Sequence, residues 1–410
     1  MKKILLISYF FPPIQSAEST MTYNLMKYLS FLGWEIIVLS AKKSKEEKID
    51  FSTSLSIPKN IHVYRTFSIE NMIFKIFSHF KILPDNKIGW IHFATKRGEK
   101  LLKNGDISAI ISRSTPITSH LVGLKLSSLT DLPWIACFSD PWTQNPYFFY
   151  PNEIIKKFNK NLEKKVMLKA DKIVVTTKQM NRLISKEYNT GDKVVTIPNS
   201  YDPSEFLYSL PNLCKKSNKK EKKFVISHIG NFYGNRSPEP FLKALKGLDK
   251  DVREGIKVRF IGSIGKFKYL ISKYKLDDII EVVDTIPRKN VFIELFNSDI
   301  LLMIDAPSTK ESMFLPSKLL EYINTKKPIL AITPEGASSS LINSTKTGII
   351  VSPENIDEIK NAIKYYYDLY HRSELKIEPD WSEIEKYSAK NCAKKLDQIL
   401  KKVIRQKKQI

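Results

Sequence analysis

Cysteine is scarce in this sequence. Its three cysteines, Cys137, Cys214 and Cys392, lie far apart and in no spacing typical of a metal site or a redox pair. A disulfide framework or a zinc module needs closely spaced pairs, so both are excluded, and we interpret the cysteines as free thiols in a reducing compartment. No cluster of histidine, cysteine, aspartate and glutamate has metal-ligand spacing either, so we expect neither a metal nor another cofactor.

A long apolar run is also missing. No stretch approaches the roughly 20 residues that a membrane-spanning helix needs. The apolar residues 4–7 resemble a signal peptide only briefly, because Phe10-Phe11-Pro12-Pro13 interrupts them and no small-residue cleavage site follows. We therefore interpret the stretch as a first buried strand, and we expect a cytoplasmic protein.

Acidic residues are few relative to basic ones. The chain has 43 Asp and Glu against 66 Lys and Arg, which gives a formal net charge of +23. Such an excess favours anionic partners, either nucleic acid or an anionic membrane surface. The lysines are scattered, and the basic segment 211–223 has no aromatic residues on which bases could stack. No nucleic acid is therefore expected, while a membrane surface stays open.

What the sequence does contain is an alternation of apolar strands with helices. Its 410 residues, 42% hydrophobic and 27% charged, suffice for two globular domains. The pattern starts at residues 4–9, restarts at 224–229 after a polar break, and implies parallel sheets with helices on both faces. We therefore predict an α/β protein with two Rossmann-like doubly wound domains, residues 1–205 and 224–381, a linker at 206–223 and a C-terminal helical segment at 382–410.

One segment does not fit the alternation. Residues 67–83 are apolar over most of a helix surface and weakly basic. Two interpretations are open. The segment could be an interfacial helix that dips into a bilayer, or a buried helix or lid packed on the first domain, which is the usual meaning of a wide apolar stripe.

The stretch 315–331 predicts a helix that begins near Pro316 and is followed by a short buried strand. Lys318 is unusual there, because the first turn of a helix already carries partial positive charge from the helix dipole. A lysine at this position is explained if N–H groups, dipole and ammonium converge on a phosphate; a surface lysine at an ordinary helix start is the alternative. Ser317 and Glu321 share a face beside that point.

This stretch resembles the donor-binding helix of the family 4 retaining glycosyltransferases, which have the GT-B fold. In the most similar subgroup the helix reads P-x-K-L-x-E-Y, followed by small or polar residues and then K-P. The matching positions here are Pro316, Lys318, Leu319, Glu321, Tyr322, Lys327 and Pro328. The resemblance implies that Glu321 holds the ribose hydroxyls of a nucleotide sugar and that the helix start holds its diphosphate. A second glutamate, common in the family eight residues earlier, is Met313 here.

A glycine-rich loop follows the first strand of the second half. Open α/β sheets bind ligands at the carboxyl ends of their strands. Gly230 would allow close backbone approach there, and Arg236 would offer a fork of donors to a phosphate. By resemblance, the family has a glycine and then two basic residues; Arg236 matches the second, and Asn231 replaces the first.

Two residues of the first half are further candidates. Asp140 follows a predicted strand in the segment D-P-W, and His120 lies in the first turns of a helix after the segment S-T-P. The resemblance covers both segments. It implies that His120 touches the acceptor or the donor phosphate and that Asp140 orients or deprotonates the acceptor. From the residues alone, a surface histidine and a turn-forming aspartate are the alternatives.

The resemblance extends over nearly the whole chain. It implies a retaining glycosyltransferase of the bacterial surface-polysaccharide type, which moves a sugar from a nucleotide diphosphate sugar to a hydroxyl of a glycan or lipid-linked acceptor. Arg236 and Lys318 would stabilise the leaving diphosphate, no metal would be needed, and the final helix would pack back toward the first domain. Attachment to the inner face of the membrane is a further option. The alternatives are a nucleotide-sugar epimerase of the same fold, or a non-catalytic membrane-surface or nucleic-acid-binding protein.

Overall fold

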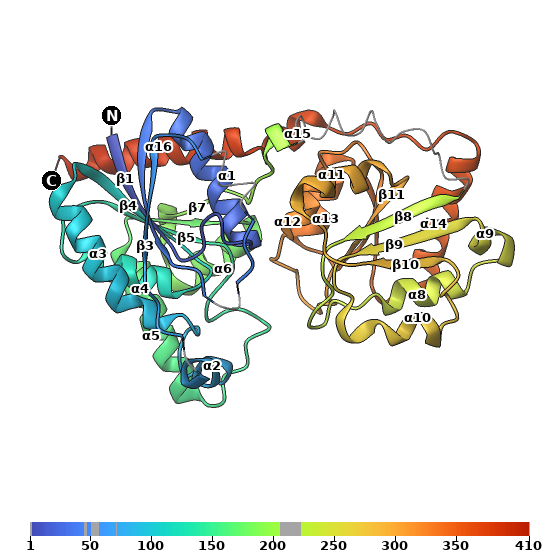
Figure 1. Cartoon of the computed structure of the whole chain (residues 1–410), viewed down its shortest axis with the longest axis horizontal. Helices are drawn as coiled ribbons and strands as arrows, with labels where there is room; N and C mark the ends of the chain where they lie inside the picture. Colours follow the sequence, from blue (N-terminus) through green and yellow to red (C-terminus); the bar gives the residue numbers. More distant parts are fainter. Residues whose placement is uncertain (1, 45–46, 51–56, 71, 206–222, 410) are drawn as a thin grey trace. The chain divides into compact units, whose positions relative to one another are not determined.

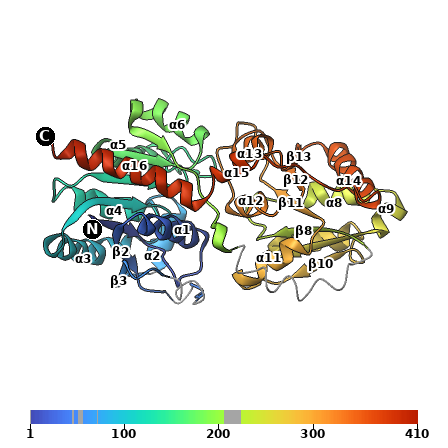
Figure 2. The same cartoon turned by 90° about the horizontal axis from the view of Figure 1, so that it is seen from above.

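The chain forms two compact units, which are described separately here. In the computed structural model, the described residues are 2–44, 47–50, 57–70, 72–205 and 223–409. One unit comprises Met1–Ser200 together with Ala389–Ile410, and the other comprises Tyr201–Ser388. Each contains one parallel sheet with helices on both faces (Figures 1 and 2).

The first unit is built on a seven-stranded sheet in the order β3-β2-β1-β4-β5-β6-β7. Its strands are β1 (Lys2–Ser8), β2 (Trp34–Ala41), β3 (Ile61–Thr66), β4 (Ile107–Arg113), β5 (Trp134–Phe138), β6 (Lys172–Val175) and β7 (Val194–Thr196). The long helices are α1 (Ala17–Phe31), α3 (Ile91–Asn104), α4 (Thr118–Ser127), α5 (Glu153–Lys169), α6 (Lys178–Tyr188) and α16 (Ala389–Lys407). All seven strands run parallel, so their carboxyl ends share one edge of the sheet.

Helix α16 completes the core of this unit, although it is distant in sequence. It packs beside α1, and Leu396 and Leu400 join Ile4 and Leu6 of β1 in one buried cluster. The Trp34 indole N–H donates a hydrogen bond to Asp397 over 2.8 Å. The C-terminal segment divides between the units, because the short helix α15 (Trp381–Glu385) belongs to the second.

These boundaries differ slightly from the predicted ones. The first unit ends at Ser200 rather than at residue 205, and the returning segment begins at Ala389 rather than at residue 382. The predicted linker 206–223 lies outside the described residues, apart from Lys223.

The second unit has a six-stranded parallel sheet in the order β10-β9-β8-β11-β12-β13. The strands are β8 (Phe224–Ile229), β9 (Ile256–Ile261), β10 (Ile280–Val283), β11 (Ile300–Ile304), β12 (Ile329–Ile332) and β13 (Gly348–Val351). The helices are α8 (Glu239–Lys246), α9 (Lys250–Glu254), α10 (Tyr269–Lys273), α11 (Arg288–Phe296), α12 (Ser317–Tyr322), α13 (Ala337–Thr345) and α14 (Ile356–His371), with α15. At the start of α8, the Ser237 hydroxyl accepts a hydrogen bond from the Glu239 backbone N–H over 3.1 Å.

The anomalous apolar segment forms a helix that is not buried. Helix α2 (Met72–His79) contains no buried residue, and Met72 and Ile73 are 68% and 57% exposed. The predicted buried helix is therefore wrong, whereas the lid packed on the first domain and the interfacial helix both stay predictions. Within the described parts of the chain, α2 included, no helix is both long and apolar enough to span a membrane.

Candidate functional site

The glycine loop and the start of α12 meet at the carboxyl end of β8. Gly230 directly follows that strand and has a φ of +134°, a conformation that side chains disfavour. A Cβ atom at Gly230 would lie 3.4 Å from the Lys318 Cδ and 3.5 Å from its Nζ. The structure thus brings together two predicted site residues that are far apart in the sequence.

Lys318 is held by a histidine that the sequence analysis did not select. The Lys318 Nζ lies 2.9 Å from the His228 Nε2, and the His228 Nδ1 lies 3.0 Å from the Leu302 carbonyl oxygen. A carbonyl can only accept, so Nδ1 carries the proton and Nε2 accepts from the ammonium. Burial, together with the nearby Arg236, lowers the pKa of Lys318 to about 7.

Arg236 is fixed on a buried carboxylate beside this pair. Its Nη2 donates to the Asp305 Oδ1 over 3.0 Å. The other Asp305 oxygen accepts from the Ser338 and Thr333 hydroxyls, over 2.8 and 3.1 Å. The Arg236 Nε is buried and has no hydrogen-bond partner among the described residues. One guanidinium N–H is therefore left for a ligand.

Glu321 belongs to an ion-pair chain at the same helix. The Arg288 Nη1 donates to the Glu321 Oε1 over 2.9 Å, and its Nε and Nη2 donate to both oxygens of Glu205 over 2.9 and 2.6 Å. Burial raises the pKa of the Glu321 carboxyl, and the Arg288 charge opposes that rise. In its ionised form this carboxylate can accept two hydroxyl hydrogen bonds, as ribose recognition requires.

The remaining predicted donor-binding residues have more local roles. The Asn231 Oδ1 accepts from the Ser263 backbone N–H over 2.8 Å, so its carboxamide oxygen is committed to the loop after β9. Pro316 is the residue before α12, with extended backbone, and Ser317 is the first helical residue. Pro316 was expected in the first turn, and the helix begins one residue later.

In the first unit, Asp140 lies just beyond the carboxyl end of β5, as predicted. Burial raises the pKa of the Asp140 carboxyl to about 6; the nearby Glu18 raises it further and Arg113 opposes the rise. Glu18 also accepts from the Ser139 hydroxyl over 2.6 Å and pairs with the Arg113 Nε. The Arg113 Nη2 donates to the Asn199 Oδ1 over 2.7 Å. Asp140 therefore stands beside a buried, charge-paired network at the carboxyl ends of β4 and β5.

His120 is an internal residue rather than a surface one. Its Nδ1 lies 2.8 Å from the Ser112 hydroxyl, its ring packs on Phe138 at 4.0 Å between centroids, and no solvent reaches it. Its Nε2 has no partner among the described residues. Burial lowers the pKa of His120 to about 3, so the ring is neutral at physiological pH.

The candidate residues fall into two groups, one in each unit. Lys318, Arg236, Gly230 and Glu321 gather in the second unit, and Asp140 and His120 lie in the first. The analysis of the sequence missed His228, Asp305, Arg288, Glu18 and Arg113. Asp305 and Arg113 had a usable signal, since each lies at the carboxyl end of an apolar strand, which is the position that singled out Asp140.

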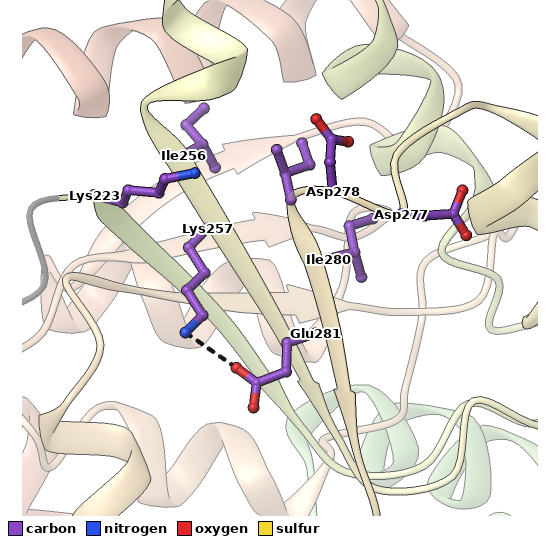
Figure 3. Close-up of a pocket in the computed structure, with 8 residues that line it drawn as sticks. Lys223, Ile256, Lys257, Asp277, Asp278, Ile280 and Glu281 are labelled. Carbon is purple, nitrogen blue, oxygen red and sulfur yellow. Dashed lines mark ion pairs between the residues drawn. The ribbon is translucent and has the colours of Figure 1, made fainter.

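The described residues add no metal site and no further cavity to these two groups. Over the described ranges, no group of three or more His, Cys, Asp and Glu residues could hold a metal ion. A hollow of about 630 Å³ is lined by Lys223, Lys257 and Asp278 among others (Figure 3). It lies at the amino ends of β8, β9 and β10, the sheet edge opposite to Gly230.

Comparisons with known proteins identify the family of the chain. A model described as "Glycosyltransferase Family 4" matches residues 19–205, and one described as "Glycosyl transferases group 1" matches residues 211–377. A protein of Methanocaldococcus jannaschii, named as an uncharacterized glycosyltransferase, is 25% identical over 345 residues, which are 81% of this chain and 84% of that protein.

Solved structures share the fold at low sequence identity. Sucrose-phosphate synthase from Thermosynechococcus elongatus is 14% identical with a TM-score of 0.70, over 98% of this chain and 99% of that one. HepE from Anabaena in complex with UDP is 13% identical with a TM-score of 0.65, over 98% of this chain and all of that one (100%). With a family model matched in each half and this fold, the chain belongs to the family 4 glycosyltransferases of GT-B fold and is an enzyme that transfers a glycosyl group.

Proposed function

We propose that the enzyme transfers a hexosyl group, with retention of configuration, from a nucleotide diphosphate sugar to a hydroxyl of a glycan or lipid-linked acceptor in surface polysaccharide biosynthesis. The position of Lys318, which lies against Gly230 and near Arg236, carries the donor half of this proposal. Two cations and a glycine meet there at the carboxyl ends of β8 and β11, where open α/β sheets bind their ligands.

The two cations suit a leaving diphosphate. Negative charge grows on that group as the glycosidic bond breaks, and preorganised cations stabilise the transition state more than the ground state. Lys318 is placed by His228, and Arg236 is placed by Asp305. Both side chains are therefore positioned before the donor binds. HepE was solved with UDP, which supports a nucleotide donor here too.

Asp140 is the proposed acceptor-side group. Its carboxyl follows β5 and lies beside Trp142, which is buried. With a pKa of about 6, it is mostly ionised at neutral pH and can accept the proton of an acceptor hydroxyl. His120 has no solvent access in this structure, so we assign it the placement of neighbouring groups rather than a direct contact.

The proposed setting is the cytoplasm, on the inner face of the membrane, with no metal needed. Support for the acceptor class is the resemblance of the segment 316–328 to the surface-polysaccharide subgroup. A metal requirement is tested directly by chelation: activity should survive EDTA, and loss that is restored by a divalent cation would contradict this part.

The donor proposal is tested by calorimetry with paired nucleoside and nucleoside diphosphate ligands. Lys318→Ala and Arg236→Ala should each weaken diphosphate binding while nucleoside binding changes little, because one charged hydrogen bond contributes about 1.5–3 kcal/mol. Lys257→Ala is the matched control, since Lys257 lies at the opposite edge of the sheet and pairs with Glu281 over 3.2 Å. Equal losses for both ligands would place the cations away from the diphosphate.

Analysis of the reaction products tests the retention of configuration and the assignment as a transferase. Transfer with an unchanged anomeric configuration is the expected outcome, and an inverted product would contradict retention. Turnover of the donor to a free epimeric sugar nucleotide, without transfer to any acceptor, would contradict the transferase assignment itself.

A further inference from the structure

Helix α2 presents an apolar surface to solvent. Ile73, Ile76 and Phe77 are 57%, 46% and 42% exposed, and Phe67 and Phe80 on its two sides are exposed as well. Burying a large apolar side chain is worth roughly 1.5–3 kcal/mol, so an exposed group of five is costly for a protein in water. Contiguous exposed apolar groups of this kind mark interaction sites.

A second segment, seventy residues later, extends the same surface. The loop before α5 and the first turns of that helix expose Tyr147, Phe149, Ile154 and Phe158, and Phe149 is 84% exposed. The end of α2 and this loop are the two walls of a hollow of about 870 Å³. We call the exposed residues of α2, its flanks and this second segment the apolar rim.

The apolar rim is surrounded by positive charge. The described residues that line the hollow include Lys75, His79 and Lys81 and no acidic side chain. On the adjoining turns of α5, Lys156 and Lys160 are exposed, and Lys160 pairs with Glu187 of α6. The exposed acid of this part of α5 is Glu153, which pairs with Lys156 over 3.1 Å.

The hollow is held in place by the elements that carry Asp140 and His120. The Asn159 side chain of α5 donates to the Lys81 carbonyl over 2.9 Å, and the Trp142 indole N–H donates to the Asn159 Oδ1 over 3.4 Å. Asp85 accepts from both the backbone N–H and the hydroxyl of Thr118 at the start of α4. The rim is therefore attached to the D-P-W loop and to helix α4, not to a free tail.

We propose that the apolar rim is the surface by which this enzyme docks on an anionic phospholipid bilayer. The rim side chains enter the boundary between headgroups and acyl chains, and the surrounding lysines meet the lipid phosphates. Charge decides between a bilayer and a protein partner: apolar tips adjoin cations, no acidic side chain is among the described residues that line the hollow, and the chain has a net charge of +23. A bilayer of negative lipids complements both features over the whole surface.

This inference deepens the proposed function, and only its consequence for catalysis depends on that function. Docking would place the Asp140 side of the first unit at a fixed depth above the membrane. An acceptor with a lipid anchor would then be captured by diffusion in two dimensions. A water-soluble acceptor would not benefit.

The test uses the full chain with vesicles of phosphatidylcholine and phosphatidylglycerol, and with phosphatidylcholine alone. We compare the wild type with Ile73→Ser/Phe77→Ser in α2 and with Phe149→Ser in the second segment. The matched control is Phe31→Ser/Leu129→Ser at the ends of α1 and α4, where the side chains are 62% and 60% exposed. All of these side chains are exposed, so melting temperatures should be unchanged. Cosedimentation is measured from low to physiological salt, and UDP binding is measured on the same preparations.

At physiological salt the α2 double variant should bind anionic vesicles at least about tenfold more weakly than the wild type, and Phe149→Ser should also bind more weakly, because each removes apolar contact with the bilayer. The control should bind like the wild type. Equal binding of all variants would mean that net charge alone attracts the protein, and would overturn the proposal. Failure of the wild type to bind the vesicles would also overturn the proposal. A wild-type oligomer that is absent in the α2 variant would overturn it too, because the rim would then be a contact between protein chains. If the wild type did not bind UDP, the proposed function would be contradicted, but the conclusion about membrane docking would still hold.

Discussion

Lys318 should make nucleotide binding depend on pH in a range where the nucleotide itself does not titrate. Its pKa in the free enzyme is about 7, because it is buried beside Arg236. A bound diphosphate brings opposite charge and should raise that pKa. Binding above pH 7 must therefore be coupled to the uptake of one proton. The second pKa of a phosphate lies near 6, so the ligand contributes little above pH 7.

The size of the effect follows from that pKa. At pH 8 a group with a pKa of 7 is about one-tenth protonated, so roughly 0.9 proton should be taken up for each nucleotide bound. Affinity should fall about tenfold for each pH unit above 7 until the raised pKa of the complex is reached. Below pH 7, Lys318 is charged in both states and this dependence disappears.

Calorimetry in pairs of buffers with different ionisation enthalpies measures the uptake directly. UDP and GDP are suitable probes, and the corresponding nucleosides are controls that should show no uptake. Lys318→Arg is the informative variant, because a guanidinium stays charged over the whole range and should abolish both the uptake and the pH dependence. Affinity that is constant from pH 7 to pH 9 in the wild type, or uptake that persists in Lys318→Arg, would refute this account of the site.

Three further predictions concern other residues. Turnover should fall as the pH drops through about 6, where the raised pKa of Asp140 leaves its carboxyl protonated. Asp140→Asn should lower turnover by roughly 10²- to 10⁴-fold with donor affinity kept, and near-normal transfer by the folded variant would remove Asp140 from the catalytic residues. Glu18→Gln should move the acid limb of the rate profile to lower pH, since it removes a negative charge that raises the Asp140 pKa; an unmoved limb would contradict the coupling. Arg288→Met should raise the pKa of Glu321 and make nucleoside binding weak at neutral pH but stronger at higher pH, while Arg288→Lys should restore part of the affinity. Loss of binding to the same extent at every pH would show that Arg288 acts only through the fold.

A strand that is buried along its whole length leaves a strong signal in the sequence. The short apolar run 300–304 is typical of a buried strand, and it forms β11, in which all five residues are buried. Strand β3 leaves a weaker signal: Ile61 is its only buried residue, and His62, Tyr64 and Arg65 lie outside the core. Local pattern reports burial, so an exposed edge leaves a weak signal.

The site was predictable where one local segment carries its own signal. Lys318 was selected because a cation opposes the dipole of its own helix. Its partner His228 is 90 residues away, and the Arg236–Asp305 pair spans 69 residues. Such pairs depend on strand order, which composition and spacing do not give. For helix α2 the sequence predicted the helix but not its surroundings. Its apolar periodicity indicates an apolar face, but periodicity does not show whether protein or another medium covers that face.

The return of α16 makes the first unit discontinuous in sequence. Cys392, Leu396 and Leu400 fill the core against α1 and β1, and Trp34 needs Asp397 for its indole hydrogen bond. During synthesis, the ribosome therefore completes the whole second unit before the first can close its core. Until α16 emerges, the early-made sheet keeps an uncovered apolar face that a holding chaperone could occupy. Removal of α16 should accordingly disable the unit that is made first, at the opposite end of the chain from the cut.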